Sequence, residues 1–522
     1  MISSEQNPSE KAVSQLEMSW LEATKQSQAP LFIWQVPAAG EPLLNALFAM
    51  QQHPEGRTLP DLFVTFTTQF DTGYGYSESL SREFIELCEA TPEAAHWRGE
   101  ARLPCYSAAR FRDLAEDFTR TFAKDMRYLV LVLQPSDVSD MQALQRWLTH
   151  WLSQTSKTVR LLLIETAEYP LWQALEQSHP QQIQRIIDDA DVMQVMHQTA
   201  RQQSDPDPDR LQLRRYLADA MLLLEKGSAS QVVSRAELAL PVVQRRGWAD
   251  QETVLYNIMA GAWLKEKNCL NAITQYQQAK RSAIQVPDPL TRGQLMTQSA
   301  FGEAGAWFAD KQYHEAAKQY REAARQAKAI PHPLFETEAW RMAGFSLLQA
   351  GRPTEAMSDY AHAIHAAEAV PYEEREQTSL PLVFQDLLRI QDKKRVSALE
   401  ACAERWQQEK KRLVLEADAA VSQLQKPETR AVSRIDNHFQ LRLEKAFLSI
   451  RQAREALIQH GSREFRQVID LAREKLHPHW NGLPGIAHPF DAPPGEWQSL
   501  PAWGKNTAEA APSLTHSSPD QT

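Results

Sequence analysis

The stretch AWFADKQYHEAAKQYREA, residues 306–323, decides the fold of much of this chain because it recurs. Two further copies are AWLKEKNCLNAITQYQQA (262–279) and SLLQAGRPTEAMSDYAHA (346–363). Each copy ends one helical segment, passes through a polar turn, and resumes with an alanine, a tyrosine four residues later and a second alanine three residues beyond it. This spacing puts small residues and a ring on one helical face, where a neighbouring helix can approach closely. The pattern predicts stacked helical hairpins.

The repeated positions are Ala272, Tyr276 and Ala279; Ala316, Tyr320 and Ala323; and Ala356, Tyr360 and Ala363. The preceding helices carry matching small residues at Ala260, Ala304 and Gly344. This pattern resembles the tetratricopeptide repeat (TPR), although the copies recur every 40 to 44 residues, against about 34 in the standard unit. A weaker fourth copy spans 220–240. The resemblance implies an all-α, TPR-like solenoid over residues 211–372, whose concave face would bind peptide segments or helices.

The first part of the chain has a different pattern, in which short apolar runs alternate with helix-length segments. The runs are LFIWQV (31–36), DLFVTFT (61–67), YLVLVLQ (128–134) and VRLLLIE (159–165). Continuous apolar runs of this length are typical of strands buried on both faces of a parallel sheet. MQALQRWLTHWLSQ (141–154) has the apolar stripe of a crossover helix. Residues 30–203 are therefore predicted to form an α/β domain with a mainly parallel sheet, after a polar N-terminal segment over 1–29.

The segment FIWQVPAAGEPLLNAL (33–48) carries a second resemblance. Its apolar run, glycine-bearing turn and amphipathic stretch resemble the nucleotide-binding portion of AAA+ or signal-transduction NTPases. A working P-loop needs G-x-x-x-x-G-K-[ST], but this turn has Gly40 alone, followed by Glu41, which would repel a phosphate. Gln134 stands where such folds place an acid for the magnesium shell. The resemblance thus implies a degenerate P-loop domain, with no catalytic, cofactor-binding or metal-binding residues and no enzymatic activity.

Two other features of this domain have alternative interpretations. Asp137 and Asp140 are expected to begin the helix over 141–154, as its cap and first-turn charges. The loop DTGYGYSES (71–79) follows a predicted strand, where glycine-bearing loops often hold ligands. It holds a small molecule or a partner loop, or it is a flexible connection with Tyr74 and Tyr76 packed on the domain surface.

The remaining segments follow from composition. SDPDPD (204–209) predicts a linker over 204–210, because proline among acids disfavours helix. Residues 373–476 contain two long, charged helical stretches, which either cap the solenoid as a hairpin or pair with another chain. Residues 477–522 are predicted to form a tail rich in proline and tryptophan, disordered in part.

Aromatic residues in this tail are candidate anchors for a pocket, either on the solenoid of the same chain or on a partner. They are Trp480, Phe490, Trp497 and Trp503. The tail also contains His477, His479, His488 and Asp491, but their spacing matches no metal-binding pattern. We therefore expect no metal site here.

The composition limits the possible partners and location. A net charge of −10 argues against a general phosphate-backbone binder, and no stretch of eighteen apolar residues is present. The four cysteines lie far apart and form no C-x-x-C pair, which favours reduced thiols. We expect a cytoplasmic protein that binds neither nucleic acid nor a membrane.

The sequence therefore predicts a non-catalytic scaffold, adaptor or chaperone that binds a partner protein or peptide through its TPR-like repeats. Polar candidates for this contact on the first helix of each unit are Asn257, Gln298, Glu303 and Arg341. One alternative is a nucleotide-regulated switch or NTPase of the AAA+ or signal-transduction type. Another is a chaperone or adaptor for a bacterial secretion-system effector. Partner identity and oligomeric state stay open.

Overall fold

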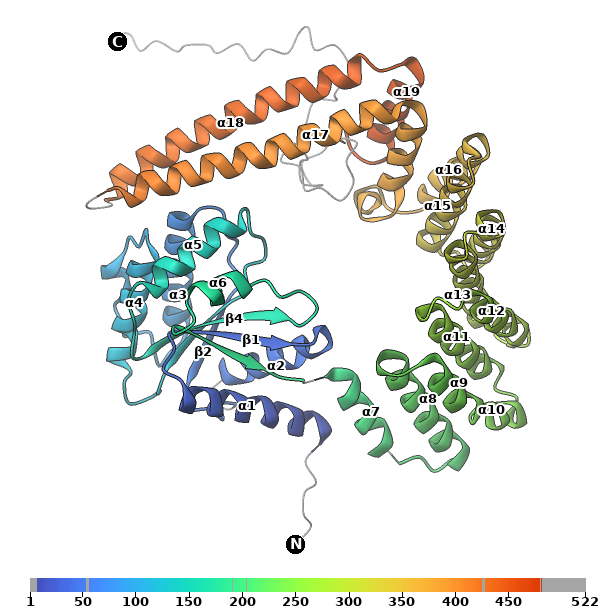
Figure 1. Cartoon of the computed structure of the whole chain (residues 1–522), viewed down its shortest axis with the longest axis horizontal. Coiled ribbons are helices and arrows are strands. Elements are labelled where there is room, and N and C mark those ends of the chain that lie inside the picture. Colours follow the sequence, from blue (N-terminus) through green and yellow to red (C-terminus); the bar gives the residue numbers. More distant parts are fainter. Residues whose placement is uncertain are drawn as a thin grey trace, which may run out of the picture. The chain divides into compact units, whose positions relative to one another are not determined.

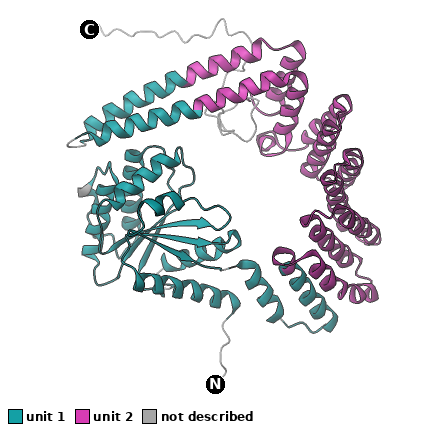
Figure 2. Cartoon of the chain, in the orientation of Figure 1, with its two compact units in different colours: residues 1–222, 407–446 teal, residues 223–406, 447–522 magenta. Residues whose placement is uncertain are grey.

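The computed structural model describes residues 7–52, 56–189, 191–202, 204–424, 428–478 and 480. The helices and strands are labelled in Figure 1, and the chain divides into two compact units (Figure 2). The first combines residues 1–222 with residues 407–446, and the second combines residues 223–406 with residues 447–522. Each unit therefore brings together segments that are far apart in the chain.

A five-stranded parallel sheet forms the centre of the first unit, in the order β2-β3-β4-β1-β5. The strands are β1 (Leu31–Val36), β2 (Leu62–Phe66), β3 (Leu129–Leu133), β4 (Val159–Thr166) and β5 (Ile183–Ile187). The predicted α/β fold class is confirmed, and the four predicted runs form β1 to β4. The fifth strand was not predicted, because this edge strand is only partly buried and its polar Gln184 and Arg185 interrupt the apolar pattern.

Helices cover both faces of this sheet (Figure 1). They are α1 (Pro8–Gln26), α2 (Glu41–Gln52), α3 (Gly73–Ala90), α4 (Ala108–Thr121), α5 (Met141–Leu152), α6 (Gln173–Ser178) and α7 (Val192–Gln202). Phe32 and Trp34 of β1 belong to the core shared with α1 and α2, whereas Leu31 and Ile33 belong to the core shared with α3, α4 and α5. This alternation follows from the two-residue period of a strand.

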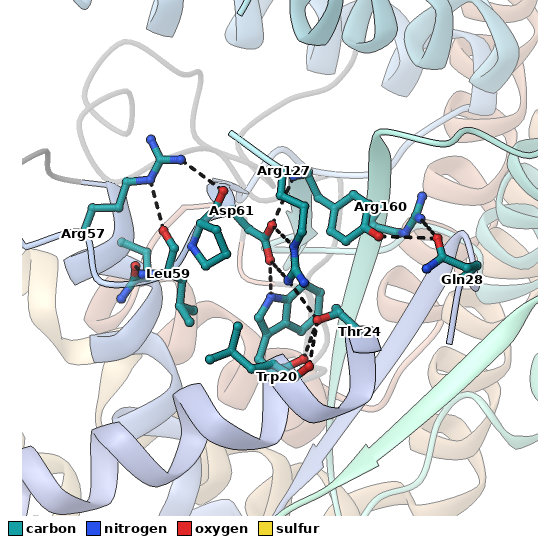
Figure 3. Close-up of polar contacts among 12 residues, drawn as sticks. Trp20, Thr24, Gln28, Arg57, Leu59, Asp61, Arg127 and Arg160 are labelled. Carbon is teal, nitrogen blue, oxygen red and sulfur yellow. Dashed lines mark hydrogen bonds and ion pairs between the residues drawn. The ribbon is translucent and has the colours of Figure 1, made fainter. Parts of the chain in front are cut away.

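The polar N-terminal segment contains helix α1, which the sequence analysis did not anticipate. Trp20 on this helix is fully buried, and its indole N–H donates to Oδ2 of Asp61 at 2.7 Å (Figure 3). Asp61 also accepts hydrogen bonds from Nε of Arg127 at 2.9 Å and from the backbone N–H of Tyr128 at 3.1 Å. Because Asp61 precedes β2 and Arg127 precedes β3, this network attaches α1 to the amino ends of both strands.

The second unit contains the predicted solenoid of helical hairpins. Its helices are α9 (Ala229–Glu237), α10 (Leu240–Arg246), α11 (Ala249–Lys265), α12 (Cys269–Ala283), α13 (Pro289–Ala309), α14 (Tyr313–Ala329), α15 (Pro333–Gln349), α16 (Pro353–Ala367) and α19 (Arg463–Lys475). All six alanines at the repeated positions are fully buried, and the three tyrosines are at most 9% exposed. The TPR-like architecture is confirmed at the positions that predicted it.

Glycines show how closely the repeats pack. A Cβ atom added at Gly344 on α15 would lie 2.8 Å from Cε1 of Tyr360 on α16, and one added at Gly302 on α13 would lie 2.4 Å from Cε1 of Tyr276 on α12. Each tyrosine ring therefore occupies the space that a side chain would need at the glycine of the neighbouring helix. Gly261 on α11 differs, because an added Cβ would meet nothing within 4 Å.

Alanine substitutions at two of these glycines should have opposite effects. Gly344→Ala should destabilise the solenoid by about 1–3 kcal/mol, because the Tyr360 ring must move. Gly261→Ala should stabilise it by about 0.5–1 kcal/mol, because alanine fits open space and restricts the unfolded chain. Thermal unfolding followed by far-ultraviolet circular dichroism measures both shifts. Shifts of the same sign would contradict this description of the packing.

Three long helices cross the boundary between the units: α8 (Pro208–Lys226), α17 (Leu380–Ser422) and α18 (Thr429–Gln459). Helix α17 is kinked at Asp392, where φ is −155° and ψ is 86°. Before the kink, Leu380 and Phe384 are buried in the core of the second unit. Residues 407–446, which contain the end of α17 and the start of α18, belong to the first unit. No helix among the described residues meets the length and apolarity needed to cross a membrane.

Candidate functional site

The turn after β1 is the position at which a P-loop would bind phosphate. Residues Ala38–Gly40 form a short 3-10 helix, and α2 begins at Glu41. The backbone N–H of Ala38 points at the carboxylate of Glu168, with nitrogen-to-oxygen distances of 3.0 and 3.2 Å, and that of Gly40 donates to the carbonyl of Pro37 at 2.7 Å. Phosphate binding relies on free backbone donors in such a turn. Here a carboxylate and a carbonyl occupy two of them.

The polar groups after β3 are also engaged. Nε2 of Gln134 donates to Oδ1 of Asn45 on α2 at 2.9 Å. Asp140 caps α5 as predicted, because its carboxylate accepts the N–H of Ala143 at 2.7 Å, and it forms an ion pair with Lys411 at 3.0 Å. Asp137 lies outside the helix, and its carboxylate accepts a hydrogen bond from Gln69 at 3.3 Å. The expectation that Asp137 supplies a first-turn charge was therefore wrong.

The sequence analysis missed a cluster of charges near the carboxyl ends of β4 and β5. Arg185 forms ion pairs with Glu165 and Glu176 and donates to Oε1 of Gln35 at 2.7 Å. Its hydrogen bond to Glu176 raises the pKa of the Arg185 guanidinium. Glu165, whose side chain is fully buried, also accepts the backbone N–H of Trp172 at 3.1 Å. These contacts hold the segment after β4 in place. These polar residues are isolated from one another in the sequence and come together only when the chain folds. No local sequence pattern could therefore have predicted the cluster.

The loop DTGYGYSES begins helix α3. Thr72 caps the helix, and Tyr76 is buried with its ring 5.0 Å from that of Phe70. The backbone N–H groups of Gly73 and Tyr74 donate to the carboxylate of Asp418 on α17, at 2.9 and 3.4 Å. The loop is therefore the start of a helix that contacts another helix of the same chain. A small molecule or a partner loop as its ligand stays a prediction.

The electrostatics of the junction between α3 and α17 combine favourable and unfavourable effects. A carboxylate near the amino end of a long helix interacts favourably with the helix dipole. Burial raises the pKa of the Asp418 carboxyl, and the backbone N–H bonds from Gly73 and Tyr74 partly oppose this effect. The Tyr74 hydroxyl donates to Asp436 on α18 at 2.8 Å, and burial followed by this bond raises the pKa of Tyr74. The phenol therefore stays protonated and able to donate.

The junction borders a groove of about 620 Å³ in the first unit, lined by Tyr106, Arg146, His150 and Asp418 among others. Apolar residues of the same long helices strengthen the junction. Leu413 and Val414 on α17 and Phe439 on α18 belong to the core that includes α3, α4 and α5. Residues 407–446 therefore contribute to the hydrophobic core of the first unit.

The four polar candidates on the solenoid have different environments. Gln298 is exposed, and Asn257 is half-buried and accepts a hydrogen bond from Ser299 at 3.0 Å. Glu303 is 1% exposed and forms an ion pair with Lys280. Arg341 is bonded to both carboxylate oxygens of Glu338, each at 2.6 Å. The structure thus places Asn257 of α11 in contact with Ser299 of α13. The ion pair between Glu303 and Lys280 links α13 to α12. A role for any of them in partner binding stays a prediction.

The aromatic tail is described only at its start. Trp480 is 2% exposed and packs against Phe384 of α17, with ring centroids 5.9 Å apart. This first aromatic residue is therefore anchored within the same chain. Phe490, Trp497 and Trp503 lie outside the described residues, as do His479, His488 and Asp491. His477 is buried and pairs with Glu376 at 3.3 Å. Within the described ranges, no group of three His, Cys, Asp or Glu residues is arranged to hold a metal ion.

Comparison with known proteins gave structural likenesses alone. No protein-family model and no curated protein sequence matches the chain. A Rap protein solved in complex with competence and sporulation factor is 11% identical, with a TM-score of 0.29, over 76% of this chain and 94% of that one. A STAND ATPase with a tetratricopeptide repeat sensor from Pyrococcus horikoshii is 10% identical, with a TM-score of 0.26, over 88% of this chain and 95% of that one. Likenesses at this level assign no function.

Proposed function

We propose that this chain is a non-catalytic adaptor that binds a peptide or helical segment of a partner protein on the row formed by α11, α13 and α15. The observation that carries the proposal is open space beside the glycines of α11 and α13. Gly261 and Gly305 hold equivalent positions, one residue after Ala260 and Ala304. An added Cβ would meet nothing within 4 Å at Gly261, and only the Tyr320 hydroxyl at 3.8 Å at Gly305.

Packing within the solenoid does not explain these two glycines. Glycine inside a helix costs about 0.5–1 kcal/mol relative to alanine. At Gly344 the close approach of Tyr360 accounts for that cost, but at Gly261 no neighbouring atom does. Room for the close approach of another backbone is the remaining physical use of glycine at such positions. A partner segment lying along the row would use that room.

Aromatic and polar side chains of the same row of helices provide the contacts that such a segment needs. The half-buried rings of Phe308 and Phe345 stack with centroids 5.7 Å apart. Rings that are partly exposed supply contact area at interfaces. Gln298 and Asn257 add amide groups able to bond a partner backbone. We propose these four residues as contacts.

The α/β domain has no assigned chemistry in this proposal, because Glu168 and Pro37 engage backbone donors of the turn that would otherwise bind phosphate. We also propose a cytoplasmic location, which agrees with the four cysteines being buried thiols. An adaptor or chaperone for a bacterial secreted effector is a narrower form of the same proposal. Its client would lie on the same row of helices.

Filling the space beside Gly261 tests the proposal. Tagged wild-type protein, Gly261→Trp and a control, Asn271→Trp, would be purified from native host cells, and the co-purifying proteins measured by quantitative mass spectrometry. Asn271 is exposed on α12, outside the row. We expect at least one partner to fall about tenfold or more with Gly261→Trp alone, which corresponds to about 1.4 kcal/mol.

Two outcomes would contradict the proposal. One is equal recovery of every partner by Gly261→Trp and the control variant, with both proteins folded by circular dichroism. The other is saturable, micromolar binding of magnesium ATP to the purified wild-type protein, lost when Gly40 is replaced by a bulky residue. The second result would favour the nucleotide-regulated switch.

A further inference from the structure

Helix α18 carries a row of basic residues on an exposed face of the first unit. Arg430, Arg434 and His438 follow one another at intervals of four residues, and all three are exposed. Four residues advance an α-helix by about 6 Å with a rotation of about 40°. The three side chains therefore form one stripe along the helix.

Among the described residues, these three basic side chains differ from their neighbour Arg442, which is paired with an acidic side chain. Glu416 on α17 forms ion pairs with Arg442 and Arg412, and its hydrogen bond from Arg442 lowers the pKa of the Glu416 carboxyl. No ion pair joins Arg430, Arg434 or His438 to a carboxylate in the part of the chain that the structure describes. The whole chain has a net charge of −10. An uncompensated basic stripe is therefore a local departure from an acidic background.

The stripe borders an apolar groove between α17 and α18. The groove has a volume of about 420 Å³, and its apolar lining includes Ala417, Ala420, Ile435 and Phe439. Its polar lining consists of Arg434, His438 and Arg442 together with Glu416, which is paired with Arg442 and Arg412. Leu441, one turn beyond His438, is 66% exposed. A surface that combines an apolar groove with a predominantly basic rim is suited to a partner that has an apolar face flanked by acidic residues.

We infer that this surface, formed by the basic stripe and the groove, docks an acidic amphipathic peptide segment of a protein partner. Apolar side chains of the segment would enter the groove, and carboxylates spaced four residues apart would pair with Arg430 and Arg434. The groove favours a peptide over nucleic acid, because phosphate-backbone binding relies on clustered cations and has no use for an apolar floor. The surface belongs to the first unit, whereas α11, α13 and α15 belong to the second, and the two proposals rest on different residues. A failure of one therefore leaves the other untouched.

A labelled model peptide tests the inference with the full-length protein. The probe is a helical peptide with leucines on one face and glutamates four residues apart on its flanks, and its control carries glutamine in place of every glutamate. Fluorescence anisotropy should show tighter binding of the acidic peptide, with an affinity that falls as NaCl rises from about 50 to about 200 mM. Arg430→Glu combined with Arg434→Glu should weaken binding about tenfold, because two exposed attractions become repulsions.

A control variant with the same change in net charge distinguishes the effect of charge at the basic stripe from the effect of the overall charge on peptide binding. Lys25→Glu combined with Lys124→Glu changes the net charge equally at exposed positions elsewhere in the first unit. This control and Gly261→Trp should both bind the acidic peptide like the wild type.

Four outcomes would overturn the inference. The first two are equal binding of the two peptides and equal weakening by the two double variants. The third is tighter binding of a DNA duplex than of the acidic peptide through the same arginines. The last is self-association in sedimentation velocity that Arg430→Glu with Arg434→Glu abolishes, because the surface would then join two copies of this chain.

Discussion

The Ile33→Asp variant should lose the folded sheet of the first unit. Ile33 is fully buried in β1, between Leu163 of β4 and Arg185 of β5 in the sheet register. Its side chain belongs to the apolar core shared with α3, α4 and α5. Burying a carboxylate there without a partner costs several kcal/mol at least, even if the group is protonated. Because a domain is stabilised by only about 5–15 kcal/mol, one such change removes much of the total.

Limited proteolysis and near-ultraviolet circular dichroism would measure this loss, because Trp34 and Trp151 lie in the cores beside the sheet. The matched control is Pro42→Ala, an exposed position in the first turn of α2. It should change stability by no more than about 0.5 kcal/mol. If Ile33→Asp remained as resistant to protease as Pro42→Ala, the assignment of β1 to an interior position of the sheet would be wrong.

The second large effect is expected at Asp61. Its side chain is fully buried and accepts hydrogen bonds from Trp20, Arg127 and the backbone of Tyr128 (Figure 3). Asp61→Ala would leave these donors without their acceptor, and removing one member of a buried ion pair costs about 3–5 kcal/mol. We expect about 3 kcal/mol, at the lower end, because Arg127 is 34% exposed and water can solvate it.

Urea unfolding followed by tryptophan fluorescence tests this prediction, since Trp20 loses its partner directly. Asp61→Asn should lie between wild type and Asp61→Ala, because an amide oxygen can still accept from Trp20 but carries no charge for Arg127. Asp71→Ala is the control, because that side chain is 62% exposed. A loss at Asp61→Ala no greater than at Asp71→Ala would show that α1 is held by its apolar contacts alone.

Helix α1 illustrates why some of the fold could not be predicted. The segment is polar on average, yet Leu16 and Trp20 are fully buried against the sheet. The hydrogen-bond acceptor of the buried Trp20 indole is Asp61, which is 41 residues away in the sequence. By contrast, the strands β1, β3 and β4 are recognisable from their own residues, because burial on both faces favours a nearly continuous apolar run.

The sequence by itself determined the repeats of the solenoid, because the spacing of alanine and tyrosine within each copy is local and sets which face can pack closely. It also excluded a standard P-loop, since the required lysine and glycine are absent from the turn. Only the tertiary structure decided which hydrogen-bond partners the polar groups of the first unit have. Ala38 meets Glu168 across 130 residues, and Gly73 meets Asp418 across 345. Such partners are brought together by folding of the whole unit, and no periodicity in the chain encodes them.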